Sequence, residues 1–167
     1  MHHTDQSNKN RVKELVEQFG LKPHPEGGYY LETYRSEEQI ETKNGNRNLV
    51  TAIYFLIEEG NVSNFHRIKS DEHWFYHEGS PLEIHVLSPE NGHETLLLGN
   101  NFANGERPHQ VVPAQAIFGS CVHENGYSFV SCVVSPGFDF QDFELFKKEE
   151  LLNDYPKHEA IINKLTP

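Results

Sequence analysis

Between Leu49 and Pro136 the chain consists almost entirely of short stretches rich in β-branched and aromatic residues, and this pattern restricts the possible folds most. Stretches such as LVTAIYFLI, EHWFYHE and YSFVSCVV are separated by short breaks that include EEG, GSP and PENGH. Two of the breaks contain Asn-Gly, the pair that favours tight hairpin turns. No helical pattern intervenes to form βαβ crossovers, so the sequence predicts an all-β antiparallel sandwich or barrel.

Helical patterns occur only near the two ends of the chain. Apolar residues recur every three or four positions from Val12 to Phe19, and Gly20 then stops the pattern. With 167 residues, the chain has the length of one domain. We predict a single domain over residues 1–167, with a helix at about 8–19, the barrel at about 28–140 and helical segments at about 147–165.

Composition argues against several classes of partner. The formal net charge of −11 argues against nucleic acid, because binding phosphate requires clustered lysine and arginine. The sequence also contains no basic cluster for a membrane surface and no apolar run near 18 residues, and the polar start MHHTDQSNKN is not a signal peptide. We therefore expect a cytoplasmic protein that contacts neither nucleic acid nor membrane.

The two cysteines, Cys121 and Cys132, are too few for a disulfide framework. They are predicted to flank a hairpin around HENG, where their side chains could face each other. We interpret them as two buried thiols in a reducing compartment, because free cysteine is among the most buried residue types.

The stretch GNVSNFHRIKSDEHWFYHEG carries the first chemical signal. Gly60, His66, Glu72 and Gly79 have the spacing of the first signature of the cupin superfamily, in which Gly, five residues, His-x-His, three or four residues, Glu, six residues and Gly follow in order. The second histidine of that signature is Ile68 here. Residues two apart on a strand share a face, and a tight turn at KSD is predicted to bring Glu72 back on the neighbouring strand, facing the same interior.

The second cupin signature, Pro-x-Gly followed after two residues by His, is altered too. In VPAQAIFG, Pro113 is present, but Gln115 stands for the glycine and Phe118 for the histidine. In metal-binding cupins these two signatures supply four ligands, so the resemblance leaves only His66 and Glu72. Zinc or iron typically takes three or more protein ligands. We predict no cofactor, with a divalent metal held by His66 and Glu72 as the alternative.

The resemblance to cupins extends over most of the chain. HPEGGYYLETYRS, TAIYFLI, FHRIKSDEHWFYHEGSPLEIH and VVPAQAIFGS, within about Pro23 to Pro136, resemble a small stand-alone cupin subgroup that is likened to sugar-nucleotide epimerases of the rhamnose pathway. This resemblance implies a cupin-type antiparallel jelly-roll β-barrel and a homodimer. It does not imply a settled activity.

Three functions are compatible with these residues. In the leading hypothesis, the barrel binds a small molecule, and its activity is left open. His66 and Glu72 are then either ligand anchors or an acid–base pair for metal-independent isomerisation or epimerisation of a carbohydrate-like or small acid substrate. One alternative is a metal-dependent cupin enzyme that uses His66, Glu72 and a third histidine. The other is a non-catalytic metabolite-binding or sensor module, in which the two residues are an inherited, hydrogen-bonded polar pair.

Other residues are candidates for contact with a small-molecule ligand. Trp74 and Tyr76 share the strand parity of Glu72, and flat aromatic rings beside polar groups suit an organic ligand, although core packing explains them equally well. Glu26 in HPEGG is either a ligand-contacting acid or part of an ordinary turn. The predicted ligand-binding residues are Glu26, Tyr30, Arg35, Trp74, Tyr76, His85 and Phe118.

Overall fold

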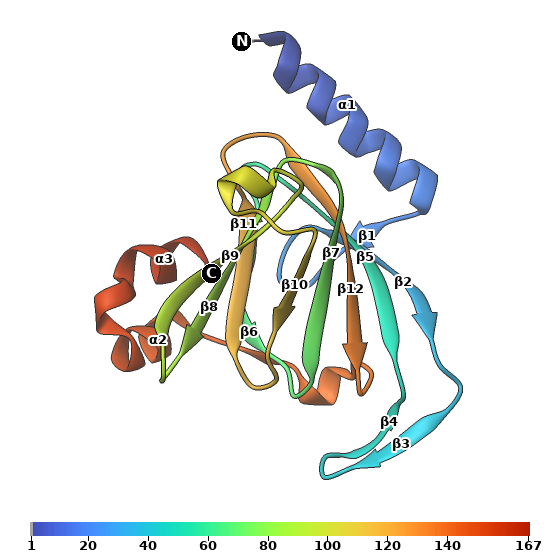
Figure 1. The fold of residues 1–167 in the computed structure, drawn as a ribbon, viewed down its shortest axis with the longest axis vertical. Coiled ribbons are helices and arrows are strands. Elements are labelled where there is room, and N and C mark those ends of the chain that lie inside the picture. Colours follow the sequence, from blue (N-terminus) through green and yellow to red (C-terminus); the bar gives the residue numbers. More distant parts are fainter. Residues whose placement is uncertain (1) are drawn as a thin grey trace.

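In the computed structural model, which describes residues 2–167, two antiparallel sheets face each other as a jelly-roll barrel (Figure 1). In spatial order, the six-stranded sheet contains β1 (Lys22–Pro23), β2 (Tyr29–Arg35), β5 (Thr51–Glu58), β12 (Tyr127–Ser135), β7 (Asp71–Gly79) and β10 (His109–Val112). The five-stranded sheet contains β13 (Glu144–Leu145), β6 (Val62–Arg67), β11 (Ile117–Val122), β8 (Leu82–Ser88) and β9 (Gly92–Leu98). The predicted fold class is confirmed.

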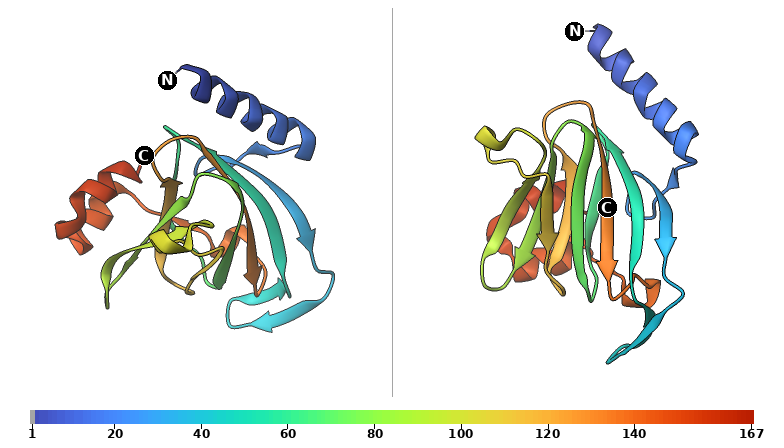
Figure 2. Two further views of the ribbon diagram at one scale, coloured as in Figure 1. Left: turned by 45° about the horizontal axis from the view of Figure 1, so that its top comes forward. Right: turned by 45° about the vertical axis from the view of Figure 1, so that its right-hand side comes forward.

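The helices lie on the outside of the barrel, at the two ends of the chain. They are α1 (His2–Phe19), α2 (Lys148–Asp154) and α3 (Glu159–Lys164), with short 3-10 turns η1 (Phe102–Asn104), η2 (Phe140–Asp142) and η3 (Pro156–His158). The views in Figure 2 place α1 on one side of the barrel and α2 and α3 on the other. The first helix begins at His2, earlier than the predicted start near residue 8. Within residues 2–167, no helix is long and apolar enough to cross a membrane.

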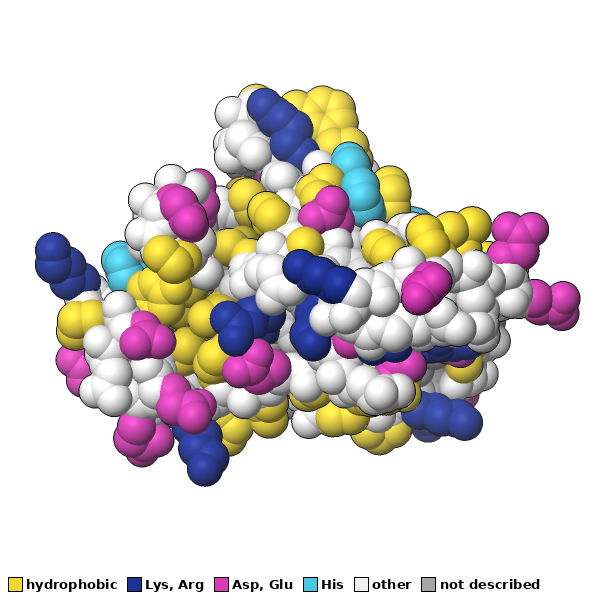
Figure 3. Space-filling view, turned by 90° about the horizontal axis from the view of Figure 1, so that it is seen from below, with side chains coloured by type: hydrophobic (Ala, Val, Ile, Leu, Met, Phe, Trp, Pro, Cys, Tyr) yellow, Lys and Arg dark blue, Asp and Glu magenta, His cyan; other side chains and the backbone are white. Residues whose placement is uncertain are grey.

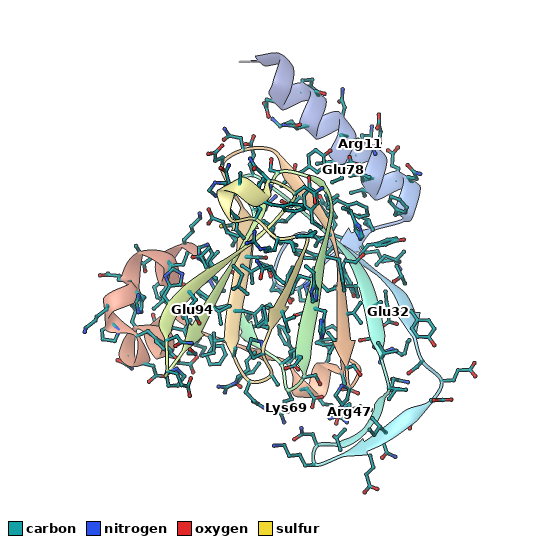
Figure 4. The ribbon with its side chains drawn as sticks, in the orientation of Figure 1. Arg11, Glu32, Arg47, Lys69, Glu78 and Glu94 are labelled. Carbon is teal, nitrogen blue, oxygen red and sulfur yellow. The ribbon has the colours of Figure 1, made fainter. Side chains whose placement is uncertain are left out.

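Helix α1 is attached to the outer face of the six-stranded sheet by its apolar stripe and by one ion pair. Val12 and Leu15 are buried in a cluster with Leu56 of β5 and residues of β12. Beside this cluster the guanidinium of Arg11 binds the carboxylate of Glu78 through two hydrogen bonds, Nε to Oε1 at 2.7 Å and Nη2 to Oε2 at 3.0 Å (Figure 4). The period-3.6 pattern thus buries one helix face on the sheet.

Strand alternation divides the apolar residues between the barrel interior and its outer surface. The main core lies between the sheets and includes Phe55, Trp74, Phe118 and Val130. A second cluster lies outside the five-stranded sheet and packs its residues, such as Phe65 of β6, against α2 and α3. The C-terminal helices are therefore held by the outward-facing residues of the same strands whose inward-facing residues form the core.

Two of the predicted turns connect the sheets instead of forming hairpins. The PENGH break does form a hairpin, with Ser88 of β8 paired to Gly92 of β9. The HENG break joins β11 to β12, however, and these strands belong to different sheets. The prediction that Cys121 and Cys132 flank a hairpin is therefore wrong. Both are free and buried, Cys121 in the outer cluster and Cys132 in the main core.

The KSD turn likewise crosses between sheets, from β6 to β7. Glu72 therefore lies on the sheet opposite His66 and not on the neighbouring strand that we predicted. The side chain of Glu72 still faces the interior, because alternation along β7 points it into the barrel, as alternation along β6 does for His66. The crossing places the two residues on opposite walls of one cavity.

A hairpin of β3 (Gln39–Thr42) and β4 (Gly45–Asn48) projects beyond one end of the barrel. The buried guanidinium of Arg47 on β4 binds both carboxylate oxygens of Asp142 at 2.7 Å and so ties this arm to η2 (Figure 4). Figure 3 views this end of the molecule, on which acidic and basic side chains are interspersed.

Candidate functional site

A cavity of about 320 Å³ lies between the two sheets. Its apolar walls include Ile53, Phe55 and Val134, and Phe138 and Phe140 border it. Among its polar lining residues are His24, Glu26, Glu32, Arg35, Ser63, His66, Glu72 and Cys132. Concave, mostly apolar cavities with a few convergent polar groups are typical of small-molecule sites.

The HPEGG segment reaches the cavity because its glycines let it approach β6 closely. Gly27 has a φ of +114°, and a Cβ atom there would lie 1.9 Å from the carbonyl oxygen of Val62. The backbone N–H of Asn64 donates a hydrogen bond of 3.0 Å to the carbonyl of Glu26. Only glycine fits this backbone at such a distance. The segment is therefore more than an ordinary turn, since it places the side chain of Glu26 in the cavity.

Glu26 lies between two histidines. Its Oε2 contacts His24 Nδ1, and its Oε1 lies 3.6 Å from His66 Nε2, with all three side chains largely buried. Burial by itself raises the pKa of Glu26, but the hydrogen bond from His24 and the proximity of His66 outweigh this effect and lower the pKa below its ordinary value. Glu26 is therefore a buried carboxylate anion at neutral pH.

The tautomer of His66 follows from its hydrogen bond to the backbone. His66 Nδ1 lies 2.7 Å from the carbonyl oxygen of Asn64, and because a carbonyl can only accept, Nδ1 carries the proton. Burial lowers the pKa of His66 although the charge of Glu26 opposes the shift. The ring is therefore neutral at pH 7, and its Nε2 has a free lone pair on the side of Glu26.

Glu72 has the opposite protonation state to Glu26. Burial raises the pKa of Glu72 to about 8, and the negative charge of Glu26 contributes to this rise. On the adjacent strand β12, the Cys132 thiol donates a hydrogen bond to Glu72, and burial together with Glu72 raises the pKa of that thiol. Glu72 and Glu26 thus give the cavity a neutral carboxylic acid and a buried carboxylate. Environments that separate two carboxyl groups in this way are typical of acid–base sites.

A hydrogen-bond donor and a cation complete the polar lining. The indole N–H of Trp74 is buried and has no hydrogen-bond partner among the residues that the structure describes. Arg35, which is partly exposed, donates from Nη2 to Glu32 at 2.6 Å and from Nη1 to the Phe138 carbonyl at 3.0 Å. An unpaired buried donor is costly unless a ligand or water accepts from it.

The structure brings six of the predicted site residues to the cavity, namely Glu26, Tyr30, Arg35, His66, Glu72 and Trp74. Phe118 is buried directly behind His66, with ring centroids 4.2 Å apart, and so supports the histidine and does not line the cavity. Tyr76 has the predicted inward parity, but its hydroxyl donates to the Gly79 carbonyl at 2.6 Å, away from the cavity.

His85, one of the predicted ligand-binding residues, does not line the cavity. Its neighbours Ile84 and Val86 belong to the main core, so alternation along β8 turns His85 to the outer face of the five-stranded sheet. Sequence reasoning also missed several cavity residues, among them His24 and Cys132. His24 could have been found from its place two residues before Glu26, and Cys132 from its shared parity with Val130 and Val134.

The cavity residues do not fit the metal site of metal-binding cupins. Ile68 and Phe118, at two of the expected ligand positions, are buried apolar side chains of the main core. Within residues 2–167, ligand atoms of three His, Cys, Asp or Glu side chains come within 4.8 Å of one another in one group, and this group lies outside the barrel. His66, Glu26 and Glu72 therefore do not converge on one ion position, and we derive no chemistry through a metal in the cavity.

A family model described as the cupin superfamily (DUF985) matches residues 13–146. This chain belongs to the cupin superfamily. It is similar to the uncharacterised protein YML079W of Saccharomyces cerevisiae, with 30% identity over 84% of this chain and 78% of the yeast protein. Two solved structures each give a TM-score of 0.87: a hypothetical protein from Leishmania major, with 40% identity over 92% of this chain and 97% of that chain, and protein SO0799 from Shewanella oneidensis, with 45% identity over 93% and 96%.

Proposed function

We propose that this cupin binds a small polar metabolite in its barrel and catalyses metal-independent proton transfer beside a carbonyl group, as in an isomerase or epimerase. The observation that carries the proposal is the pairing of a neutral acid and a neutral base on opposite walls of one cavity. His66 on β6 has a free Nε2 lone pair, and Glu72 on β7 has its pKa raised to about 8. Neither group requires a metal to act at neutral pH.

Each group has a defined role in such a reaction. His66 Nε2 removes the proton from the carbon next to the carbonyl, and the Glu72 carboxyl donates a hydrogen bond to the carbonyl oxygen as an enolate develops. Glu26, whose Oε1 is 3.6 Å from His66 Nε2, stabilises the imidazolium that forms. In epimerisation, Glu72 on the opposite wall gives its proton to the other face of the same carbon, and His66 and Glu72 then recover their starting states by exchanging protons with water. In isomerisation, Glu72 moves a proton between the two oxygens of the enediol, and His66 returns the abstracted proton to the neighbouring carbon.

The lining indicates the class of substrate. A cavity of about 320 Å³ is at the lower end of the range for small-molecule sites and suits a monosaccharide or a small hydroxy or keto acid. The unpaired N–H of Trp74 can donate to a hydroxyl or carbonyl oxygen of the ligand. Arg35 at the edge of the lining is paired with Glu32, so the carboxylate or phosphate of a ligand would compete with Glu32 for the guanidinium.

Proton exchange provides a test that does not require the natural substrate. The protein is incubated in D₂O with a panel of sugars, hydroxy acids and keto acids, and loss of the proton adjacent to the carbonyl is followed by NMR. We expect exchange with at least one compound, with a loss of about 10²-fold or more in His66→Ala and Glu72→Gln. His73→Ala is the matched control, because His73 lies on the outer face of β7 next to Glu72 and contacts His109.

Binding of the same compounds, measured in parallel by thermal shift, separates the alternatives. Exchange that is lost in His66→Ala while binding persists supports catalysis. Saturable binding without exchange in the parent protein refutes the isomerase and leaves a metabolite-binding or sensor module. Exchange that requires an added divalent ion and disappears with chelator refutes the metal-independent reaction and supports the metal-dependent alternative.

A further inference from the structure

A second cluster of chemically capable side chains lies on the outside of the five-stranded sheet, separate from the cavity. Cys121 of β11 is paired in register with Glu83 of β8, and His85 lies two residues further along β8. These positions alternate with core residues such as Ile84, so all three side chains project outward, near α3. Two of the three, His85 and Cys121, are buried.

We propose that Glu83, His85 and Cys121 bind a divalent transition metal ion, with Zn²⁺ as the best fit. The thiolate, imidazole and carboxylate groups are the three ligand types that zinc prefers in proteins. Their ligand atoms all lie within 4.8 Å of one another, which no other group of His, Cys, Asp or Glu side chains achieves within residues 2–167. A site here is independent of the cupin ligand positions that Ile68 and Phe118 occupy.

The distances agree with a tetrahedral ion. Bonds of about 2.0 Å to nitrogen or oxygen and about 2.3 Å to sulfur place two tetrahedral ligand atoms about 3.3–3.6 Å apart. Cys121 Sγ lies 3.5 Å from Glu83 Oε2 and 3.7 Å from His85 Nε2, close to this geometry. His85 Nε2 and Glu83 Oε2 are 2.8 Å apart and share a hydrogen bond, so they would separate by about half an ångström when the ion replaces the proton.

Neighbouring residues orient the ligands, and the fourth position faces solvent. His123 Nδ1 lies 2.6 Å from the other oxygen of Glu83, and its ring, 41% exposed, places the site at the edge of solvent. His85 Nδ1 lies 2.9 Å from His93 Nε2, so the ring nitrogen that faces away from the ion is held by a second side chain. Metal-binding histidines are usually oriented in this way. A water at this solvent edge can complete the tetrahedron.

The buried Cys121 thiol stays protonated until an ion binds. Burial raises the pKa of Cys121, whereas Lys164 of α3 opposes that rise. A divalent ion supplies much more positive charge than one lysine and binds the deprotonated sulfur, releasing its proton. Lys164 is exposed, so its side chain can move into solvent when an ion binds.

Titration of the intact, untagged protein with Co²⁺ alone tests the proposal, because cobalt bound to a thiolate gives a charge-transfer absorption band. We expect one equivalent to bind with this band, and Zn²⁺ to displace it. Cys121→Ser should abolish the band and weaken binding about tenfold or more. The matched control is Cys132→Ser, which removes the other cysteine, on the opposite sheet and facing the cavity, and should keep the band.

Two further variants keep the test decisive. Glu83→Gln retains the size of the side chain and a hydrogen bond to its histidines, so it tests metal binding if Cys121→Ser does not fold. We expect it to lower the affinity for Co²⁺ by about tenfold or more. His66→Gln separates this site from the barrel. The proposal is overturned if the parent protein shows no saturable binding, if the band persists in Cys121→Ser, or if binding is lost in His66→Gln but unchanged in Glu83→Gln.

Discussion

The buried acid of the cavity makes the stability of this protein depend on pH in a way that a single substitution isolates. Burial raises the pKa of Glu72 from 4.5 to about 8, a difference of 3.5 pH units between the ordinary and folded values. Each unit corresponds to about 1.36 kcal/mol. Titration of Glu72 can therefore change the unfolding free energy by about 5 kcal/mol at most, between acidic pH, where Glu72 is neutral, and alkaline pH, where it is ionised. Replacing it by neutral, similarly sized glutamine removes this titration.

The sign follows from the direction of the shift. Since the folded pKa is raised, the folded chain holds the proton that the unfolded chain has lost between pH 4.5 and 8. The contribution is fully present below pH 4.5 and is lost as the pH rises toward 8. As the pH rises, the unfolding free energy of Glu72→Gln should therefore increase relative to that of the parent protein by about 1.4 kcal/mol per pH unit, or about 3 kcal/mol between pH 5 and 7.

Urea denaturation of both proteins at several pH values from 5 to 8 measures this difference. Glu26, His66 and Cys132, which face Glu72 in the cavity, are present in both chains, so their direct contributions largely cancel. Glu94→Gln, at an exposed position on β9, is the control for loss of a carboxylate in contact with water (Figure 4). A parent-to-Glu72→Gln difference that stays constant from pH 5 to 8 would refute the reasoning, because Glu72 would then be ionised in the folded protein.

Three other predictions concern the backbone, the thiols and the assembly. Gly27→Ala should lower the unfolding free energy several-fold more than Gly60→Ala. A Cβ atom at Gly60 contacts no other atom, so that variant costs only about 1–2 kcal/mol for its left-handed backbone. Equal losses of unfolding free energy would show that HPEGG is not held against β6. Because burial raises the pKa of both thiols, Cys121 and Cys132 should resist iodoacetamide at pH 7 in the folded protein and react after denaturation. Mass spectrometry measures the labelling, and rapid labelling of the folded protein would contradict this prediction. The homodimer stays a proposal, and sedimentation of the parent protein at micromolar concentration tests it. A dimer is the expected result, and monomer alone would exclude it.

The amino-acid pattern predicts the fold class and the direction in which many side chains point. Period-two alternation along EHWFYHE predicts that Glu72 and Trp74 face the interior and that His73 faces outward, and the structure agrees. The apolar period of 3.6 near the N-terminus likewise predicts the face of α1 that packs on the sheet. These properties depend on the geometry of one strand or one helix, so residues adjacent in sequence are sufficient to specify them.

Which side chains meet depends on how the strands are arranged in three dimensions. The KSD and HENG turns connect different sheets, which places Glu72 opposite His66 and separates Cys121 from Cys132. The close approach of Gly27 to β6 brings Glu26 beside His66, although 39 intervening residues separate them in the sequence. The physical reason is that alternation specifies a face but not a partner: pairing between distant strands is determined by the packing of the whole core, and the protonation states of the cavity depend on the burial that this packing creates.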